Sequence, residues 1–277
     1  MTDPRATSSN TCYRHPNRQS FVLCQRCGRT ICGECQTPGA VGFICPECMK
    51  EQRQSAPRNR VGARITSSSP IVTYTIIAVT AFVFLLQWIP GLHVTDALLY
   101  AGLYSNPAYA FEPWRMLTAV FVHSQSFLFH ILLNMYTLWI FGRMLETMLG
   151  HWRFLALYLI SGFAGSLGVL FLAAPNVPVV GASGAIFGLL GAFLVIQRKL
   201  GGNTTGLLVL LGINLVIGFI PGINIAWQAH VGGLVGGALV GLILVGTRKI
   251  SQRTAQIGLL SLLSVALIGV SLIPALT

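Results

Sequence analysis

Four polar side chains interrupt the long apolar segments that follow residue 70: His130, Asn134, Ser183 and His230. A serine hydroxyl becomes a nucleophile when a base removes its proton, and neutral imidazole is the usual base near neutral pH. Ser183 and His230 are therefore candidates for a catalytic nucleophile and its base. Negative charge that develops on a substrate oxygen needs oriented donors, which His130, Asn134 and the Ser183 backbone N–H could supply.

A second group of chemically active residues lies before residue 50 and consists of seven cysteines and one histidine. They form four pairs, each separated by two residues: Cys12 with His15, Cys24 with Cys27, Cys32 with Cys35, and Cys45 with Cys48. Such pairs are typical of tetrahedral zinc sites, and eight ligands suffice for two ions. An iron–sulfur cluster is the alternative, but the histidine and the four short pairs favour zinc. Disulfides are not expected in a cytoplasmic segment.

The composition places most of the chain in a membrane. Hydrophobic residues make up 53% of the 277 residues and charged residues only 9%, against about 25% charged in soluble domains. Apolar stretches recur at lengths near the roughly 20 residues that a helix needs to cross a bilayer. We expect seven spans, at approximately 71–90, 127–145, 152–174, 180–197, 204–220, 226–246 and 256–275. The expected fold class is an all-α polytopic membrane protein.

The basic residues predict the orientation of these spans, because Lys and Arg accumulate in cytoplasmic loops. If the N-terminus is cytoplasmic, only Arg115 lies in an outer segment. The inner segments then carry Arg53, Arg58, Arg60, Arg64, Arg143, Arg153, Arg198, Lys199, Arg248, Lys249 and Arg253. This distribution explains the net charge of +11 without a nucleic-acid partner. The odd number of spans places the C-terminus outside, and the absence of a secretory or organellar presequence favours a bacterial plasma membrane.

Alternation of the spans places the four polar residues in one layer. The second, fourth and sixth spans run in the same direction, so each begins at the outer face. At 1.5 Å per residue, the four polar residues lie roughly 4–11 Å below that face. Gly184 and Gly188 in the fourth span, and Gly233, Gly237 and Gly241 in the sixth, favour tight helix contact. Such a contact would bring the candidate nucleophile towards its base.

The remaining polar residues of the membrane region receive structural interpretations. Its acidic residues are Asp96, Glu112 and Glu146, and none lies at the depth of the serine, so we expect a dyad and not a triad. Glu146 is expected to accept hydrogen bonds near the inner loop, and Arg115 to stabilise its own loop. No role is assigned to the histidines in loops or at span ends, which are His93, His123 and His151.

At the residues of the predicted dyad, the sequence resembles the rhomboid family of intramembrane serine proteases. The resemblance covers roughly residues 70–250. Its motifs are Gly181-Ala182-Ser183-Gly184, His230 with Gly233 and Gly237, His130 with Asn134, Trp114-Arg115, and Glu146 at the end of the second span. It implies a rhomboid-like six-helix bundle at 71–250, with a water-filled cavity open to the outer face. The seventh, C-terminal span at 251–277 departs from that pattern.

The cysteine-rich segment, residues 1–50, precedes a linker at 51–70 and resembles a B-box-type zinc finger. That resemblance implies that pairs one and three share one ion and that pairs two and four share the other. Spacing alone does not distinguish this interleaved arrangement from a sequential one. The segment has little apolar content for a core, so we expect metal to supply most of its folding energy. Contact with a cytoplasmic protein is its expected role.

The rhomboid resemblance implies a function. Substrates would be single-pass transmembrane proteins that enter laterally from the lipid bilayer and are cut through an acyl-enzyme on the serine. Catalysis would need no cofactor. Two other classes of function compete: a non-cleaving scaffold that binds membrane proteins, and a membrane-anchored zinc-finger adaptor. A transporter is disfavoured, because its polar residues should lie near the middle of the membrane.

Overall fold

The computed structural model describes residues 10–39, 41–54, 61–62, 69–109, 111–219 and 225–275. The chain divides into two units between Pro57 and Arg58. Most of the predicted linker, 51–70, lies outside the described residues, and so do Arg58, Arg60 and Arg64 of the predicted inner segments.

The N-terminal unit is built from very short elements. These are β1 (Thr11–Cys12) paired antiparallel with β2 (His15–Gln19), β3 (Thr37–Pro38) paired antiparallel with β4 (Phe43–Ile44), the 3-10 helix η1 (Gly33–Cys35), and the helix α1 (Pro46–Gln54). Two-stranded hairpins of this length are not stable by themselves in water. The buried cluster of the unit contains all seven cysteines, and Ile31 is the one buried aliphatic residue among its described members. The sulfur atoms therefore occupy the place of an apolar core.

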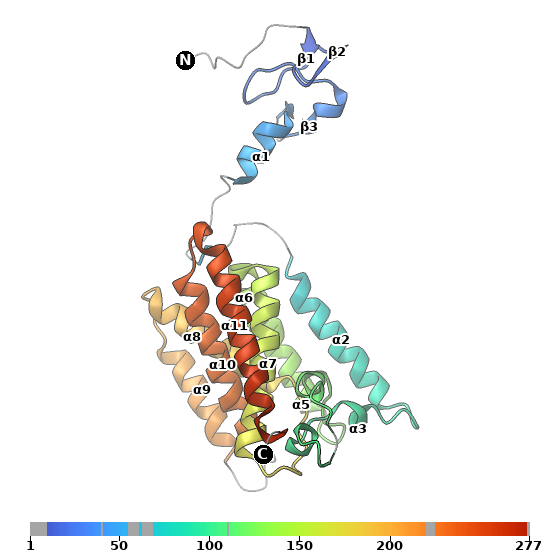
Figure 1. The fold of residues 1–277 in the computed structure, drawn as a ribbon, viewed down its shortest axis with the longest axis vertical. Coiled ribbons are helices and arrows are strands. Elements are labelled where there is room, and N and C mark those ends of the chain that lie inside the picture. The colour runs from blue at the N-terminus through green and yellow to red at the C-terminus, as the bar shows by residue number, and fades with distance from the viewer. Residues whose placement is uncertain are drawn as a thin grey trace. The chain divides into compact units, whose positions relative to one another are not determined.

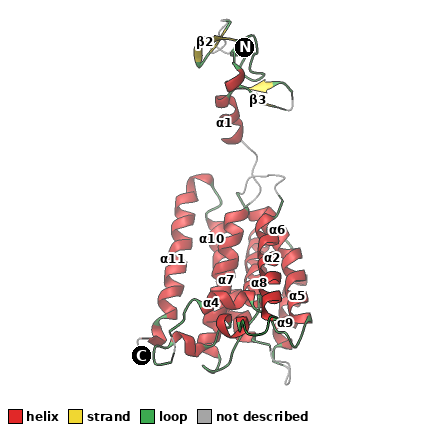
Figure 2. Ribbon diagram, turned by 90° about the vertical axis from the view of Figure 1, so that its right-hand side faces the viewer, coloured by secondary structure: helices red, strands yellow, loops and turns green. Residues whose placement is uncertain are grey.

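The second unit is helical, as Figure 2 shows. Its long helices are α2 (Ile71–Gln87), α5 (Phe129–Thr137), α6 (Arg143–Leu149), α7 (His151–Leu172), α8 (Ser183–Lys199), α9 (Thr205–Ile217), α10 (Trp227–Gly246) and α11 (Arg253–Ser271). A π-helical segment, η4 (Leu138–Gly142), joins α5 to α6, so these three elements form the helix predicted at 127–145. Each of the seven predicted apolar stretches is therefore a helix, the seventh included.

Among the described residues, three helices have both the length and the apolar composition to cross a membrane: His151–Leu172, Trp227–Gly246 and Ile250–Ser271. The apolar helices α2 and α9 are shorter. Many large apolar side chains of α2, α9 and α11 are exposed, which is the arrangement expected of faces that contact lipid.

Short elements fill the long connection between α2 and α5. These are α3 (Val94–Leu98), the 3-10 helix η2 (Gly102–Ser105), α4 (Arg115–Thr118) and the 3-10 helix η3 (Ala119–Phe121). Arg115 is buried and donates hydrogen bonds to the Glu112 carboxylate and to the backbone carbonyls of Asp96 and Leu99. The expectation that Arg115 stabilises its own loop is confirmed.

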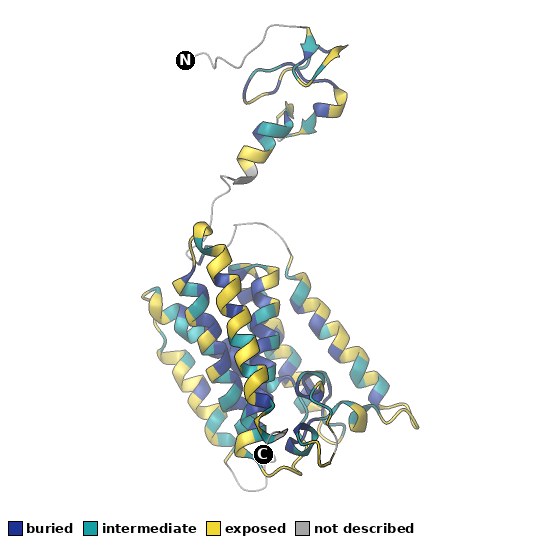
Figure 3. Cartoon of the chain, viewed as in Figure 1, coloured by how far each residue is buried: buried dark blue, intermediate teal, exposed yellow. Residues whose placement is uncertain are grey.

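Helices α7, α8 and α10 form the centre of the unit (Figure 1) and carry most of its buried positions (Figure 3). Glycines allow this close packing. A Cβ atom at Gly233 would lie 1.9 Å from the carbonyl oxygen of Gly184, and one at Gly237 would lie 1.9 Å from that of Gly188. The backbones of α8 and α10 are therefore in direct contact, as the glycine pattern predicts.

Glu146 connects the second predicted span to the first. Its carboxylate is buried and accepts hydrogen bonds from the backbone N–H groups of Val72 and Thr73, at 2.9 and 2.7 Å, and from the Thr73 hydroxyl at 2.6 Å. The His151 ring contacts the same carboxylate. These donors belong to the first turn of α2, whose N–H groups have no partner within the helix. The structural role expected of Glu146 is confirmed, although its main partners lie in a helix and not in a loop.

Candidate active site and metal centres

Ser183 is the first residue of α8 and follows a sharp turn of the backbone. Gly181 makes this turn with φ of +120°, a conformation that L residues rarely adopt, and its N–H donates to the Ala119 carbonyl at 2.9 Å. A cavity of about 20 Å³ adjoins Ser183 and is lined by Gly162, Gly165 and other small residues. A space of this size holds about one water molecule. The serine hydroxyl therefore lies where small residues leave room beside it.

His230 lies on α10, beside the start of α8. A Cβ atom at Gly184 would come 3.2 Å from the carbonyl oxygen of Ala229, so the sequence neighbours of Ser183 and His230 are in contact. The His230 ring is buried and stacks on Phe187, with ring centroids 4.0 Å apart. Among the described residues, its Nδ1 has no hydrogen-bond partner, and no hydrogen bond joins the ring to Ser183. Catalytic hydrogen bonds often form only when substrate is bound, so this geometry is compatible with a base.

The hydrogen bonds of His130 determine which of its nitrogen atoms can donate. The backbone N–H of Ser124 donates to His130 Nδ1 at 3.3 Å, so in the neutral ring the proton is on Nε2. A Cβ atom at Gly181 would come 2.7 Å from His130 Nε2. The free donor of His130 therefore lies at the turn that precedes Ser183, as an oxyanion donor would need to.

Asn134 is buried one turn further along α5. Its side-chain amide donates to the His130 carbonyl at 2.7 Å, which uses one of the two N–H bonds of that group. The second N–H bond has no protein acceptor among the described residues. The structure thus brings His130 and Asn134 to one face of α5, as their spacing of four residues predicts.

His123, to which the sequence assigned no role, is fully buried beside His130 and Ala182. Its Nε2 accepts a hydrogen bond from the backbone N–H of Ala182 at 3.4 Å, and its ring centroid lies 5.1 Å from that of His130. The side-chain amide of Gln87, at the end of α2, forms two hydrogen bonds with the backbone of His123. Its oxygen accepts from the His123 N–H at 3.1 Å, and its nitrogen donates to the His123 carbonyl at 2.9 Å. In the sequence, the one indication that His123 belongs to the site is that it lies close to His130.

The eight predicted metal ligands fall into two groups of four. One group is Cys12, His15, Cys32 and Cys35, and the other is Cys24, Cys27, Cys45 and Cys48. In each group the ligand atoms lie within 4.8 Å of one another. Pairs one and three thus form one site and pairs two and four the other. The interleaved arrangement implied by the B-box resemblance is the one that the structure adopts.

Distances between the ligand atoms fit a tetrahedral zinc ion. Zinc–sulfur bonds of about 2.3 Å at a tetrahedral centre put two sulfur atoms about 3.8 Å apart. Cys27 Sγ and Cys45 Sγ are separated by 3.8 Å. In the other group, His15 Nδ1 lies 3.3 Å from Cys32 Sγ and 3.5 Å from Cys35 Sγ. All the cysteines are free and buried, so the donor set suits zinc in both number and geometry.

Donors around the sulfur atoms favour thiolates, the form that binds metal. Arg29 donates to Cys27 Sγ and Cys45 Sγ, both at 3.3 Å. Burial alone would raise the pKa of the Cys24 thiol, but backbone N–H groups, that of Cys45 first, outweigh it and lower the pKa to about 6. Cys12 in the other group behaves in the same way, with a pKa lowered to about 6 by backbone donors that outweigh burial. These donors therefore favour the thiolate form of Cys24 in one group and of Cys12 in the other.

Comparisons with known proteins relate this chain to one family. A family model of the Rhomboid domain matches residues 110–247. The chain is 38% identical over 192 residues to the rhomboid protease GluP of Bacillus subtilis (strain 168), which covers 67% of this chain and 37% of that protein. It is 40% identical over 143 residues to RHOMBOID-like protein 6, mitochondrial, of Arabidopsis thaliana, covering 48% of this chain and 44% of that one.

A further relative is matched over nearly its whole length. YdcA of Bacillus subtilis (strain 168), named as a candidate rhomboid protease, is 33% identical over 185 residues, which cover 65% of this chain and 91% of that protein. By contrast, the chain spans less than half of the length of GluP and of RHOMBOID-like protein 6. The range that the family model matches, residues 110–247, contains Ser183 and His230.

Proposed function

Because this chain belongs to the rhomboid family, we propose that it is an intramembrane serine endopeptidase with Ser183 as nucleophile and His230 as general base. The observation that carries the proposal is the contact of Gly184 with the Ala229 carbonyl, which brings the sequence neighbours of the two residues together. The free Nε2 donor of His130 beside Gly181 supports it, because acyl transfer needs a donor at that side of the serine.

The proposed reaction begins when His230 removes the proton from Ser183 Oγ, which attacks the carbonyl carbon of the scissile peptide bond. The oxyanion accepts hydrogen bonds from the Ser183 N–H, from His130 Nε2 and from the second N–H of the Asn134 amide. Protonated His230 then gives its proton to the leaving amine, and the acyl-enzyme remains. A water molecule activated by His230 hydrolyses this ester and restores the serine.

We propose single-pass transmembrane proteins as the substrates, reached from within the bilayer. The protein is an integral membrane protein, and the excess of Lys and Arg at one end of its helices supports a cytoplasmic N-terminus. The active site then opens towards the outer face, and the C-terminus after α11 lies outside. A bacterial plasma membrane is the proposed location.

For the N-terminal unit, we propose two structural zinc ions and a role in binding a cytoplasmic protein. The fit of the sulfur and nitrogen atoms to tetrahedral geometry supports the metal. Phe21 and Val41 are largely exposed on this small unit, with 75% and 80% of their surface accessible. If these side chains contact a partner protein, their apolar surface would be buried in the complex.

Cleavage of a reporter transmembrane segment by the full chain in lipid vesicles tests the proposed reaction. Ser183→Ala and His230→Ala should each lower the rate by about a thousandfold or more, since nucleophile and base act as a unit. Ser264→Ala is a matched control, because Ser264 lies on α11 and, among the described residues, its hydroxyl donates just to the Leu260 carbonyl of its own helix, at 2.9 Å. Undiminished cleavage by Ser183→Ala would contradict the mechanism. Binding of the reporter by the unmodified chain without cleavage would favour a scaffold.

A further inference from the structure

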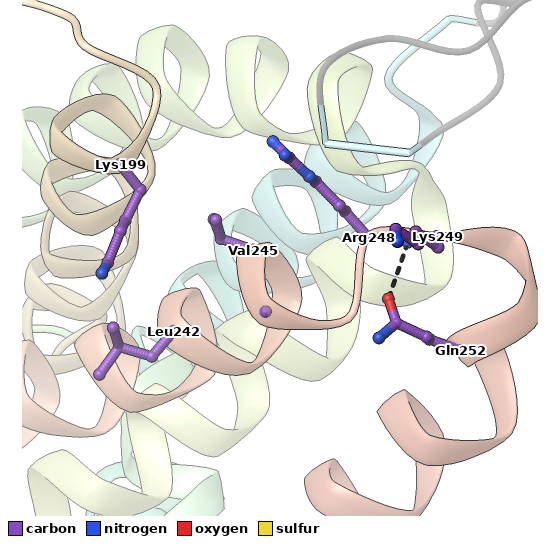
Figure 4. Close-up of a pocket in the computed structure, with 7 residues that line it drawn as sticks. Lys199, Leu242, Val245, Arg248, Lys249 and Gln252 are labelled. Carbon is purple, nitrogen blue, oxygen red and sulfur yellow. Dashed lines mark hydrogen bonds between the residues drawn. The ribbon is translucent and has the colours of Figure 1, made fainter.

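A basic pocket lies at the end of α8 that is opposite Ser183. Its volume is about 540 Å³, and it is lined by Lys199, Leu242, Val245, Gly246, Arg248 and Lys249. Figure 4 shows Lys199 and, below it, Leu242 on one side of the pocket, Arg248 and Lys249 on the other, and Val245 between the two sides. Since α8 has 17 residues, the pocket is about 24 Å from the serine along the helix axis. The proposed peptidase does not use it.

The cations of the basic pocket have no acidic partner within their unit. No Asp or Glu follows Glu146 in the sequence. Among the described residues, the acidic groups of this unit are Asp96, Glu112 and Glu146, and their ion pairs are with His93, Arg115 and His151. The positive charges of Lys199, Arg248 and Lys249 around the basic pocket repel one another unless an anion neutralises them. The counter-ion of the basic pocket must therefore come from outside the membrane unit.

The walls of the basic pocket combine charge with apolar surface. Leu242 and Val245 of α10 supply the apolar part of the wall, and Leu242 is 46% exposed, whereas Val245 is half-buried. A ligand with a phosphate and a hydrocarbon chain matches both parts of the wall.

We propose that the basic pocket binds the headgroup of an anionic phospholipid, with its phosphate among Lys199, Arg248 and Lys249 and one acyl chain along Leu242 and Val245. Basic pockets between helices on the cytoplasmic side of a membrane are suited to such headgroups. The proposal requires only the membrane placement of the helices. It stands or falls independently of the peptidase activity, because the lipid measurement involves no cleavage.

Native mass spectrometry of the full chain, released from vesicles of phosphatidylglycerol and phosphatidylcholine, measures the bound lipid directly. The triple variant Lys199→Gln, Arg248→Gln, Lys249→Gln should retain at least about tenfold less phosphatidylglycerol than the unmodified chain. The matched control removes the same charge from the same end of the helices but outside the pocket, through Arg143→Gln, Arg198→Gln and Arg253→Gln. Its retention should change by less than about twofold. Equal losses in both variants would overturn the proposal.

A second variant fills the basic pocket without changing its charge. A Cβ atom at Gly246 would meet no atom within 4 Å, so Gly246→Leu places its side chain in the open pocket. Gly258 on α11 is equally open and lies outside the pocket, so Gly258→Leu is the control. Gly246→Leu should displace phosphatidylglycerol and Gly258→Leu should not. Unchanged retention in Gly246→Leu would mean that the cations only neutralise helix ends, and would refute the lipid site.

Inorganic phosphate distinguishes a lipid from a free phosphate as the ligand. Millimolar inorganic phosphate, added to the unmodified chain in phosphatidylglycerol vesicles, should leave lipid retention unchanged, because phosphate lacks the acyl chain that Leu242 and Val245 contact. Displacement of the lipid by phosphate, or stoichiometric phosphate binding in phosphatidylcholine vesicles, would show a site for the free ion and overturn the proposal.

Discussion

The ring of His130 lies against the backbone of Gly181, so that any side chain at Gly181 would collide with His130 Nε2, 2.7 Å from the position of its Cβ atom. This contact joins the start of the second predicted span to the turn before α8. Gly181 therefore has two roles in the site: it allows the sharp turn before Ser183, and its missing side chain leaves room for His130 Nε2.

Gly181→Ala should therefore lower cleavage of the membrane reporter at least tenfold, because its Cβ atom would displace His130 or the turn before Ser183, in addition to a backbone strain of about 1–3 kcal/mol. Gly201→Ala separates strain from contact, because Gly201 also has a positive φ, of 77°, but its Cβ would meet no atom within 4 Å. We expect Gly201→Ala to lower the melting temperature without lowering the rate per folded molecule. Equal rates in the two variants would show that the His130 contact does not matter.

The contact between α8 and α10 predicts which glycines tolerate substitution. Gly233→Ala or Gly237→Ala would place a Cβ atom 1.9 Å from a carbonyl oxygen of α8, which neither backbone can avoid without moving. We expect each to destabilise the folded unit by about 3 kcal/mol and to reduce cleavage with it. On the same helix, Gly246→Ala meets open space and should leave stability unchanged or higher. Thermal unfolding in detergent measures the difference, and similar melting temperatures for Gly233→Ala and Gly246→Ala would contradict it.

Hydropathy was enough to predict the seven helices, because a span of about 20 apolar residues can satisfy its backbone in lipid only as a helix. The glycine pattern likewise predicted the contact of α8 with α10. The short elements between α2 and α5 were not predicted, because their formation depends on tertiary partners such as Arg115 and not on periodicity.

Side-chain partners in the site were less accessible from sequence. The proton position on His130 follows from the Ser124 N–H, and the burial of His123 follows from Gln87, which is 36 residues away. Neither relation leaves a pattern in one sequence. The pairing of the metal ligands was open for the same reason, since equal spacings within all four pairs carry no information about which pairs meet.

His123 is predicted to position the turn that carries the serine. His123→Ala would leave the Ala182 N–H buried without an acceptor, at a cost of about 1–3 kcal/mol. We expect the maximal cleavage rate of the folded protein to fall about tenfold or more, with little change in the substrate concentration at half-maximal rate. The control His93→Ala removes a histidine that is 78% exposed and should change neither quantity. Full activity of His123→Ala would exclude a positioning role.

Removal of metal should unfold the N-terminal unit alone. Its buried cluster consists mainly of cysteines, so chelation removes the interactions that replace an apolar core. We expect elemental analysis to find two zinc ions per chain. After chelation, hydrogen exchange should become fast throughout residues 12–48, while the melting temperature of the membrane unit stays the same. Persistent protection of residues 12–48 without metal would contradict the prediction.

Paired substitutions test the interleaved arrangement of the two sites. Cys12→Ser with Cys35→Ser affects one group of ligands and should leave one zinc ion bound, whereas Cys12→Ser with Cys24→Ser affects both groups and should leave none. A sequential arrangement predicts the opposite result for each pair. Zinc content per chain, measured on the purified protein, therefore decides between them.

Helix α8 begins at Ser183 and has Arg198 and Lys199 in its last turn. The aligned peptide groups of a helix carry about half a positive elementary charge at its first turn and half a negative one at its last. The negative end of this macrodipole is neutralised by the two cations, whereas no acidic residue of the first turn neutralises the positive end. An alkoxide at Ser183 would be stabilised without the movement of any side chain, by the backbone of the 17-residue helix that begins with this serine.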